Sequence, residues 1–579
     1  MSRLFLSLIG LLSAAMIALP ATAAAEPPSN DHFAGATVIS SLPFTDDADL
    51  TEATGEPGEP QSCANLSQTV WYSITPSTDE FIHADATDLS VFKTEIDVYR
   101  DDGSGAGGLT VLDCGSYGRS LDIPLEAGKT YYIEAGNAWG YGGTLQVNVD
   151  VAPTPGDAGA PPVASPYNDP ANGTWFDANG TFLLAGQPIF PIVLAKPPPF
   201  DGVTPSGTDA LDEVVAAGAN LFKVGPPGPG EPPYKWQRWT DAAIANAQAW
   251  DAAALARGAH TWINLDTLSR AIPGTASETL LRKVVTSLLG DASARGIGLW
   301  KGSDEPWWSK FAPSVLQFPY CLVTGRGDPS WCAGREPIDG THAWVTIEAP
   351  VGTAADLAPY SAVTDTHGVD IYPVGARIAD PDLHQVGRWT NTVESITPNH
   401  SVWTTLQVCF SGSSQPNGGY VLPTRLQERF MIYDSIINGA RGLAFYGGNF
   451  TRCQTATDRA LGWNWTFWND VLADLVREIN AHSPLASVLV NPASTHRPTS
   501  SDATTEVISR HARGSNDLWV IAARYGAGTA DVTISGLPRA ITSGEVYTEG
   551  RSVSVKDGSF TDSFDRWGVH VYRFSPPAR

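Results

Sequence analysis

The feature that most constrains the fold of this 579-residue chain is an alternation of short apolar runs with helical stretches between residues 167 and 484. Short apolar runs separated by helices are typical of parallel strands buried on both faces. We expect eight strands, at residues 189–194, 220–224, 260–265, 297–300, 343–347, 368–371, 402–406 and 442–445. We expect helices between them, for example at 240–257, 278–289 and 424–437. Eight strand–helix units predict a (β/α)8 TIM barrel, and an open doubly wound sheet is the alternative.

The two flanks of this region have a different pattern, in which short β-rich runs are separated by Gly, Pro and Asp turns. Residues 28–150 and residues 485–579 each predict a small β-sandwich. Residues 151–166 are rich in Pro, Gly and Ala and predict a linker. The chain is therefore expected to be multidomain, with a barrel over residues 167–484 flanked by an N-terminal and a C-terminal β-sandwich.

The N-terminal β-rich segment resembles the bacterial pre-peptidase C-terminal domains. The matching residues are Asn30-Asp31-His32-Phe33, Ala36-Thr37, Val70-Trp71-Tyr72, Asp97-Val98-Tyr99 and Gly128-Lys129-Thr130-Tyr131-Tyr132. The resemblance implies a jelly-roll accessory domain, of a kind appended to secreted hydrolases, and we assign no chemistry to it.

Residues 1–25 have the pattern of a secretory signal peptide. Arg3 supplies the positive end, residues 4–19 form the apolar run, and small residues follow at 21–25. No later stretch approaches the roughly 20 apolar residues that span a bilayer. We therefore expect a secreted, extracellular protein with no membrane span.

The chain contains six cysteines, and an oxidising compartment favours disulfides over metal ligation. Pairing between sequence neighbours is the simplest arrangement, and it predicts the bonds Cys63–Cys114, Cys321–Cys332 and Cys409–Cys453. The spacing of these cysteines predicts no metal site, and no cofactor is expected.

The charge balance argues against nucleic acid as a partner. The chain carries 36 Lys and Arg against 61 Asp and Glu, a net charge of −25. A protein that binds a polyanion needs a basic face, and this composition does not favour one.

Polar and aromatic side chains follow the predicted barrel strands. A TIM barrel keeps its reactive groups at the carboxyl ends of its strands, so we expect these side chains to meet at one rim. The carboxylates there are Asp266, Asp304, Glu305, Glu348 and Asp370. The other candidate binding residues are Trp300, Trp307, Tyr372, Gln407, Tyr446 and Asn449, and Trp344 and Lys223 lie nearby.

Clustered carboxylates interleaved with aromatic rings suit glycosidic bond cleavage. This reaction needs one protonated carboxyl group to donate a proton to the leaving oxygen, and a second, ionised one to attack the anomeric carbon or to activate water. A cluster of acids in an apolar wall creates this asymmetry, because it raises the pKa of one member while another stays low. Trp faces can hold a sugar ring by stacking.

The segment Ser303-Asp304-Glu305-Pro306 resembles the Asn-Glu-Pro motif of the large clan of retaining barrel glycoside hydrolases. The opening Gly186-Gln187-Pro188-Ile189-Phe190-Pro191 is also similar to that clan, and the resemblance spans about residues 170–484. It implies that Glu305 is the general acid. Two departures matter, because Asp304 replaces the usual Asn, and Gln407 stands where the clan has its nucleophilic Glu.

Three explanations of Gln407 remain open. In the first, a neighbouring strand supplies the second carboxylate, with Asp370 the first choice and Glu348 the second. In the second, the site is inverting, with one of these acids activating water across a gap of roughly 6.5–9.5 Å. The third explanation is a barrel that has lost catalysis and only binds glycans.

The leading hypothesis is a secreted glycoside hydrolase that acts on an extracellular polysaccharide, with Glu305, Asp370 and Glu348 as candidate catalytic residues. A non-catalytic glycan-binding protein that uses the same cleft is the alternative. An esterase or lyase is disfavoured, because the chain has neither a nucleophile-elbow serine motif nor metal-ligand spacing. The sequence defines neither the sugar nor the oligomeric state.

Overall fold

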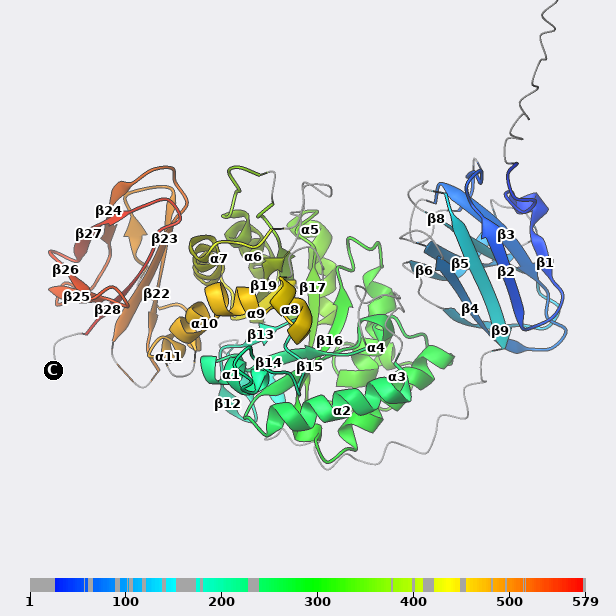
Figure 1. The fold of residues 1–579 in the computed structure, drawn as a ribbon, viewed down its shortest axis with the longest axis horizontal. Coiled ribbons are helices and arrows are strands. Elements are labelled where there is room, and N and C mark those ends of the chain that lie inside the picture. Colours follow the sequence, from blue (N-terminus) through cyan, green and yellow to red (C-terminus); the bar gives the residue numbers. More distant parts are fainter. Residues whose placement is uncertain are drawn as a thin grey trace, which may run out of the picture. The chain divides into compact units, whose positions relative to one another are not determined.

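The computed structural model describes residues 26–575 apart from short gaps (Figure 1). These gaps are residues 57, 61–65, 89–93, 102, 104–107, 117–120, 138–141, 152–172, 177–180, 227–238, 376–377, 398–400, 410–420, 448–454, 481–482, 495–496, 514 and 516. No helix among the described residues is long and apolar enough to cross a membrane.

Eight parallel strands form a closed barrel in chain order. They are β13 (Ile192–Leu194), β14 (Leu221–Val224), β15 (His260–Asn264), β16 (Ile297–Asp304), β17 (Ala343–Glu348), β18 (Thr366–Ile371), β19 (Ser401–Cys409) and β20 (Gly442–Gly447). The last strand pairs with the first, with Leu443 beside Ile192, and this pairing closes the sheet. The predicted (β/α)8 barrel is therefore confirmed, and the open doubly wound alternative is wrong.

Side chains alternate between the inside of the barrel and the helix layer, because the side-chain period of a strand is two residues. Along β17, Val345 and Ile347 point inward and pack with Trp262 of β15, whereas Trp344 points outward. The short sheet of β10 (Thr174–Phe176), β11 (Phe182–Leu184) and β12 (Gln187–Pro188) precedes the barrel. Phe182 packs against Trp403 near the start of β19, so β11 covers the amino end and leaves the carboxyl end for a site.

Helices follow the barrel strands (Figure 1). They are α1 (Ala210–Ala217), α2 (Asp241–Leu255), α3 (Ala276–Leu289), α4 (Pro313–Thr324), α5 (Ala354–Leu357), α6 (Gln385–Ile396), α7 (Arg425–Ile437), α8 (Ala456–Leu461), α9 (Trp465–Phe467), α10 (Ala473–Ile479) and α11 (Ala486–Leu489). Side-chain caps fix several helix starts. Thr424, for example, accepts from the backbone N–H of Gln427, whose side chain accepts from Thr424 in return.

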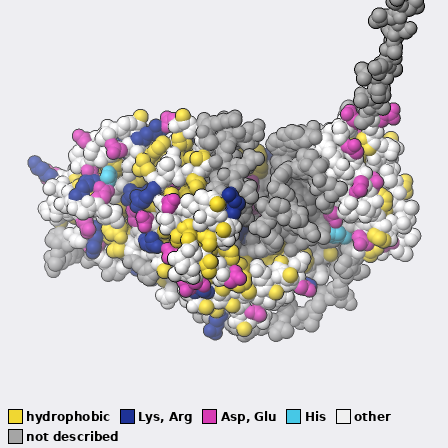
Figure 2. Space-filling view, in the orientation of Figure 1, with side chains coloured by type: hydrophobic (Ala, Val, Ile, Leu, Met, Phe, Trp, Pro, Cys, Tyr) yellow, Lys and Arg dark blue, Asp and Glu magenta, His cyan; other side chains and the backbone are white. Residues whose placement is uncertain are grey.

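The C-terminal region consists of two sheets that enclose an apolar core (Figure 1, orange to red). The first sheet is β21 (Thr499–Ser500), β24 (Ala530–Ser535) and β27 (Ser559–Phe564), and the second is β22 (Thr505–His511), β23 (Leu518–Arg524), β28 (Val569–Phe574), β25 (Ser543–Val546) and β26 (Arg551–Ser554). Trp519 and Val571 of the second sheet share one hydrophobic core with Phe430 and Met431 of α7. Basic and acidic side chains lie interspersed on the face of this region that Figure 2 shows.

The N-terminal region is also made of two β-sheets (Figure 1, blue to cyan). One contains β1 (Thr37–Ile39), β3 (Gln68–Ile74), β8 (Tyr131–Asn137), β5 (Thr94–Asp101) and β6 (Leu109–Ser116), and the other contains β2 (Phe44–Asp49), β9 (Thr144–Val151), β4 (Glu80–Asp88) and β7 (Leu121–Leu125). The multidomain architecture predicted from the sequence, a barrel with β-rich regions before and after it, is confirmed.

Cys321 and Cys332 form a disulfide that joins α4 to the short turn that follows it, as predicted. The other two predicted pairs, Cys63–Cys114 and Cys409–Cys453, involve side chains outside the described part of the chain.

Candidate active site

A cavity of about 170 Å³ lies at the carboxyl ends of the barrel strands. It is lined by Ala195, Lys223, Trp262, Lys301, Asp304, Glu305, Ile347, Asp370, Tyr372, Thr405 and Tyr446. Five of these residues were predicted from the sequence as site residues, namely Asp304, Glu305, Asp370, Tyr372 and Tyr446. Three carboxyl groups and two lysines therefore surround one space.

The end of β16 departs from regular strand geometry, and this departure brings two consecutive acids into the cavity. The pairing of β16 with β17 shifts register between Lys301 and Asp304. Glu305 then adopts a left-handed backbone with φ of 46°, and its N–H donates to the carbonyl oxygen of Ile347 at 2.6 Å. In a regular strand, neighbouring side chains point to opposite faces. The left-handed residue breaks this alternation, so Asp304 and Glu305 both line the cavity.

The left-handed conformation of Glu305 is a strained arrangement for a residue with a Cβ atom, at a cost of about 1–2 kcal/mol. Strain of this kind is concentrated at functional sites. Burial raises the pKa of the Glu305 carboxyl group to about 9, and the charges of Asp370 and Asp304 add to the effect. Glu305 therefore holds its proton at neutral pH.

Asp370 is the second carboxyl group of the cavity, and its side chain is 8% exposed. Val369 and Ile371 pack into the outer core, so the alternation of β18 turns Asp370 inward. Its Oδ2 accepts a hydrogen bond of 2.9 Å from the hydroxyl of Tyr372, whereas Oδ1 has no hydrogen-bond partner among the described residues. Burial raises its pKa to about 7, and the negative charge of Asp304 contributes.

The pKa of Asp304 is lowered, whereas the pKa values of Glu305 and Asp370 are raised. Burial alone would raise the pKa of Asp304, but the positive charges of Lys301 and Lys223 lower it below the ordinary value. Lys301 Nζ lies 2.8 Å from Asp304 Oδ1, and the Asp304 side chain is 47% exposed, so the effect of the neighbouring lysines outweighs that of burial. The predicted site residue Asp266 lies just outside the cavity, and its Oδ1 accepts from the Asp304 backbone N–H at 2.9 Å. The cavity thus combines an ionised carboxylate with carboxyl groups that hold their protons at higher pH.

Glu348 points away from the cavity. It follows the inward residue Ile347, so its side chain faces the helix layer, where Oε1 lies 3.4 Å from His367 Nε2 and Oε2 accepts from the Trp307 backbone N–H at 3.4 Å. Its side chain is fully buried. The structure therefore brings Asp370 to Glu305 and does not bring Glu348 into the cavity.

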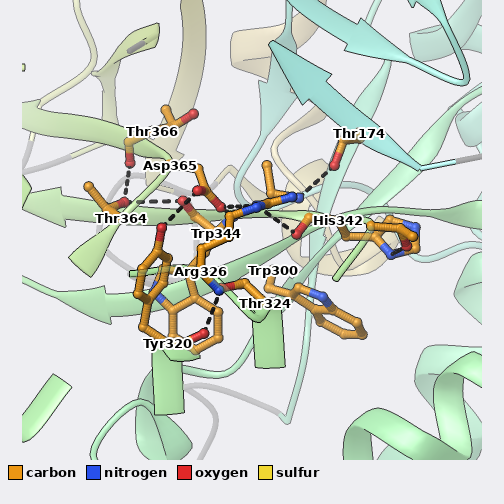
Figure 3. Close-up of polar contacts among 12 residues, drawn as sticks. Thr174, Trp300, Tyr320, Thr324, Arg326, His342, Trp344, Thr364, Asp365 and Thr366 are labelled. Carbon is orange, nitrogen blue, oxygen red and sulfur yellow. Dashed lines mark hydrogen bonds and ion pairs between the residues drawn. The ribbon is translucent and has the colours of Figure 1, made fainter. Parts of the chain in front are cut away.

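Trp300 and Trp344 also lie outside the barrel, beside a polar network around Arg326 and Asp365 (Figure 3). The Trp300 indole donates to Asp339 Oδ2 at 2.6 Å. Trp300 follows the inward residue Leu299, so the same alternation places its ring in the outer core. It is not among the cavity-lining residues.

Gln407 and Trp307 are not among the residues that line the cavity. The amide of Gln407 is fully buried, accepts from the Val374 backbone N–H at 2.9 Å and donates to the Val374 carbonyl oxygen at 2.7 Å. Gln407 therefore braces the segment after β18. Trp307 is half-buried, with Lys310 Nζ 4.3 Å from its ring centre. Asn449 lies outside the described residues.

Sequence reasoning did not identify Lys301, Trp262 and Thr405 as cavity residues. A signal for Lys301 existed, because a lysine two positions after the inward Leu299 must point into the barrel if the strand is regular.

One group of described residues has the donor types of a metal site, at a place distinct from the cavity. His384, Asp434 and Glu506 offer ligand atoms within 4.8 Å of one another. The His384 ring is already engaged, since Nδ1 lies 3.0 Å from Asp434 Oδ1 and Nε2 lies 3.6 Å from Glu506 Oε1. This trio links α7 and the segment before α6 to β22.

Comparisons with known proteins identify no family for this chain. No family model matches, and no curated protein matches. Among solved structures, a chain titled "Glycoside hydrolase" has a TM-score of 0.45 at 13% identity and covers 71% of this chain and 98% of that chain. A family 5 glycoside hydrolase from Bacteroides vulgatus has a TM-score of 0.46 at 13% identity and covers 71% and 95%. A β-L-arabinopyranosidase from Geobacillus stearothermophilus has a TM-score of 0.43 at 10% identity and covers 67% and 97%.

Proposed function

We propose that this protein is a secreted glycoside hydrolase that cleaves an extracellular polysaccharide, with Glu305 as the proton donor and Asp370 as the partner carboxylate. The observation that carries this proposal is that the two carboxyl groups line one cavity with different tendencies to ionise. Glu305 holds its proton to about pH 9, whereas Asp370 loses its proton near pH 7. Between these values the pair is in the state that glycosidic cleavage requires.

In this mechanism the carboxyl group of Glu305 donates its proton to the glycosidic oxygen as the bond to the anomeric carbon breaks. Asp370 either attacks the anomeric carbon, which gives a covalent intermediate that water hydrolyses, or removes a proton from a water molecule that attacks directly. In both routes one water is consumed, and its hydroxyl group ends on the anomeric carbon. The unpartnered Oδ1 of Asp370 is the atom available for this step.

The other lining residues have supporting roles. The hydroxyl of Tyr372 donates to Asp370 Oδ2 and so fixes the orientation of that carboxylate. Asp304 stays ionised and stabilises positive charge that develops on the sugar ring in the transition state. Trp262 provides an apolar wall for the sugar.

The extracellular setting rests on the sequence. Residues 1–25 have the pattern of a signal peptide, and the disulfide Cys321–Cys332 suits an oxidising compartment. A polysaccharide substrate fits an exported enzyme with an additional β-rich region better than a small glycoside does.

The test compares wild type with Glu305→Gln and Asp370→Asn on a panel of cell-wall polysaccharides, with the configuration of the products followed by NMR. Each variant should lose at least about 10²-fold in turnover and still bind glycans. Glu336→Gln is the matched control, because Glu336 is exposed and is not part of the cavity. A non-catalytic glycan-binding protein would show no turnover in the wild type and unchanged binding in the variants, and this result would exclude the hydrolase. Retention of configuration would identify Asp370 as a nucleophile, and inversion would identify it as a base.

A further inference from the structure

Two lysines, Lys223 and Lys301, line the cavity, and one of them forms an ion pair with a cavity carboxylate. Lys301 makes the ion pair with Asp304, at 2.8 Å. Lys223 comes from β14, on the other side of β15, and it lines the same cavity. Its Nζ has no carboxylate oxygen within 4.0 Å among the described residues, and the contact that it does make is with the ring of Tyr446, 5.8 Å from the ring centre.

The carboxyl groups of the cavity differ in their charge at neutral pH. Asp304 is held ionised, but Glu305 keeps its proton and Asp370 is close to its half-ionised state. Burial is the main cause that lowers the pKa of Lys223 to about 8. The charge of Lys301 adds to this effect, and the charges of Asp304 and Asp266 oppose it. Lys301 pairs with Asp304, so Lys223 is the cation of the cavity that faces no carboxylate oxygen within 4.0 Å among the described residues, although the whole chain has a net charge of −25.

A second donor lies beside Lys223. Tyr446 follows the outward residue Phe445 on β20, so its ring points inward and lines the cavity. Burial raises the pKa of Tyr446 far above its ordinary value, so the phenol stays a hydrogen-bond donor at any working pH. Its hydroxyl makes no hydrogen bond with the described residues. The ammonium group and the phenol both belong to residues that line the cavity, and neither is held by a carboxylate among the described residues, so they offer two donors to an oxyanion.

Resting on the proposed hydrolase function, we infer that the sugar bound in this cavity is a hexuronic acid, whose carboxylate is held by Lys223 Nζ and the hydroxyl of Tyr446. The acidic sugar is an isolated residue of an otherwise neutral glycan. A long polyanion would be repelled by a protein of net charge −25, whereas a single carboxylate in the cavity meets the ammonium group of Lys223. Lys223 is then a residue that determines specificity, and Glu305 and Asp370 carry out the cleavage.

The experiment uses pairs of glycans that differ only in charge. Glucuronoxylan and an arabinogalactan with glucuronic acid side chains are each compared with the same polymer after carbodiimide-mediated reduction of its uronic acids to neutral hexoses. Binding of D-glucuronate and D-galacturonate to the Glu305→Gln variant is measured by calorimetry, against D-glucose and D-galactose. The native polymers and the free acids should be preferred by about 10- to 100-fold, which is the range for a charge-assisted hydrogen bond.

Variants of Lys223 test whether this residue causes the preference for acidic over neutral glycans. Lys223→Met should bring the ratio of acidic to neutral kcat/KM close to one, and Lys223→Arg should keep most of it. Lys283→Met is the matched control, because Lys283 pairs with Asp241 on the surface and its side chain is 52% exposed. If Lys223 only helps to keep Asp304 ionised, its loss will slow both members of each pair equally, and the ratio will not change.

The outcomes separate this inference from the proposed function. Glu305-dependent cleavage of the reduced polymers at an equal or higher rate, or equal binding of acids and neutral sugars, would overturn the hexuronic acid assignment and leave the hydrolase intact. If the wild type cleaves no polymer and Glu305→Gln binds none of the sugars, both proposals fail. Preferential turnover of polygalacturonate or alginate would overturn the isolated-residue assignment in favour of a polyanionic substrate.

Discussion

The most direct test of the cavity electrostatics is the stability of the Glu305→Gln variant as a function of pH. The substitution keeps the size of the side chain and removes its ionisable group. In the folded protein, burial raises the pKa of Glu305 from 4.5 to about 9, whereas in the unfolded chain it has its ordinary value. The folded state therefore has to keep a proton that the unfolded chain releases, and above pH 4.5 this difference lowers the stability of the wild type.

The magnitude follows from the same two values. The interval between the ordinary pKa of 4.5 and pH 7 is about 2.5 pH units, and each unit corresponds to about 1.4 kcal/mol. The wild type thus loses up to about 3.5 kcal/mol at pH 7, and solvent screening of the partly exposed Glu305 carboxyl group reduces this figure. Glu305→Gln should recover this free energy at pH 7 and gain nothing below pH 4.5, while it loses activity.

Urea denaturation, followed by the fluorescence of the buried barrel tryptophans, measures the effect at pH 4, 5.5, 7 and 8. Glu336→Gln is the control, since it makes the same chemical change at an exposed position. The reasoning is refuted if Glu305→Gln is no more stable than the wild type at pH 7, or if its gain is the same at pH 4 and pH 7.

Three further outcomes are expected. The pH profile of kcat/KM should be bell-shaped, rising near pH 7 as Asp370 ionises and falling near pH 9 as Glu305 loses its proton. A maximum near pH 5 would contradict the assignment of Glu305 as proton donor and Asp370 as its ionised partner. Gln407→Glu should lower the denaturation midpoint at pH 7 without increasing activity, because a carboxylate cannot donate a hydrogen bond to the Val374 carbonyl oxygen. A gain in turnover would instead identify position 407 as a nucleophile site. His384→Gln should destabilise the protein more at pH 5.5 than at pH 8.5. Although burial lowers the pKa of His384, its hydrogen bond to Asp434 and the charges of Asp434 and Glu506 raise it overall, so the protonated ring stabilises the fold and this contribution is lost as the pH rises through the raised pKa. Equal losses of thermal stability at both pH values would refute this prediction.

The sequence was sufficient to place the barrel strands, because each is an apolar run buried on both faces. The expected strand at 343–347 compares with β17 at Ala343–Glu348, and the expected strand at 442–445 with β20 at Gly442–Gly447. The positions of the acidic residues just after the predicted strands indicated that their carboxylates would lie together at the carboxyl end of the barrel, and Glu305 and Asp370 do line one cavity.

The direction of individual side chains was harder to predict than the strands. Glu348 and Trp300 stand close in sequence to cavity residues, yet both face the helix layer, because one residue along a strand changes the face. Glu305 reaches the cavity only through a left-handed backbone that no propensity of Glu indicates. The role of Gln407 as a brace depends on the path of the chain near Val374, which the local sequence does not encode.

The core that α7 shares with the C-terminal sheets has a practical consequence for attempts to isolate a minimal enzyme. Removing residues after about 485 would uncover Phe430 and Met431 and would leave the Arg429 guanidinium without the Val569 carbonyl oxygen to which it donates at 2.7 Å. α7 packs against β19, so loosening it would disturb the strand that carries the cavity residue Thr405. The smallest fragment that folds with a working cavity should therefore extend from the barrel through the last β-strand.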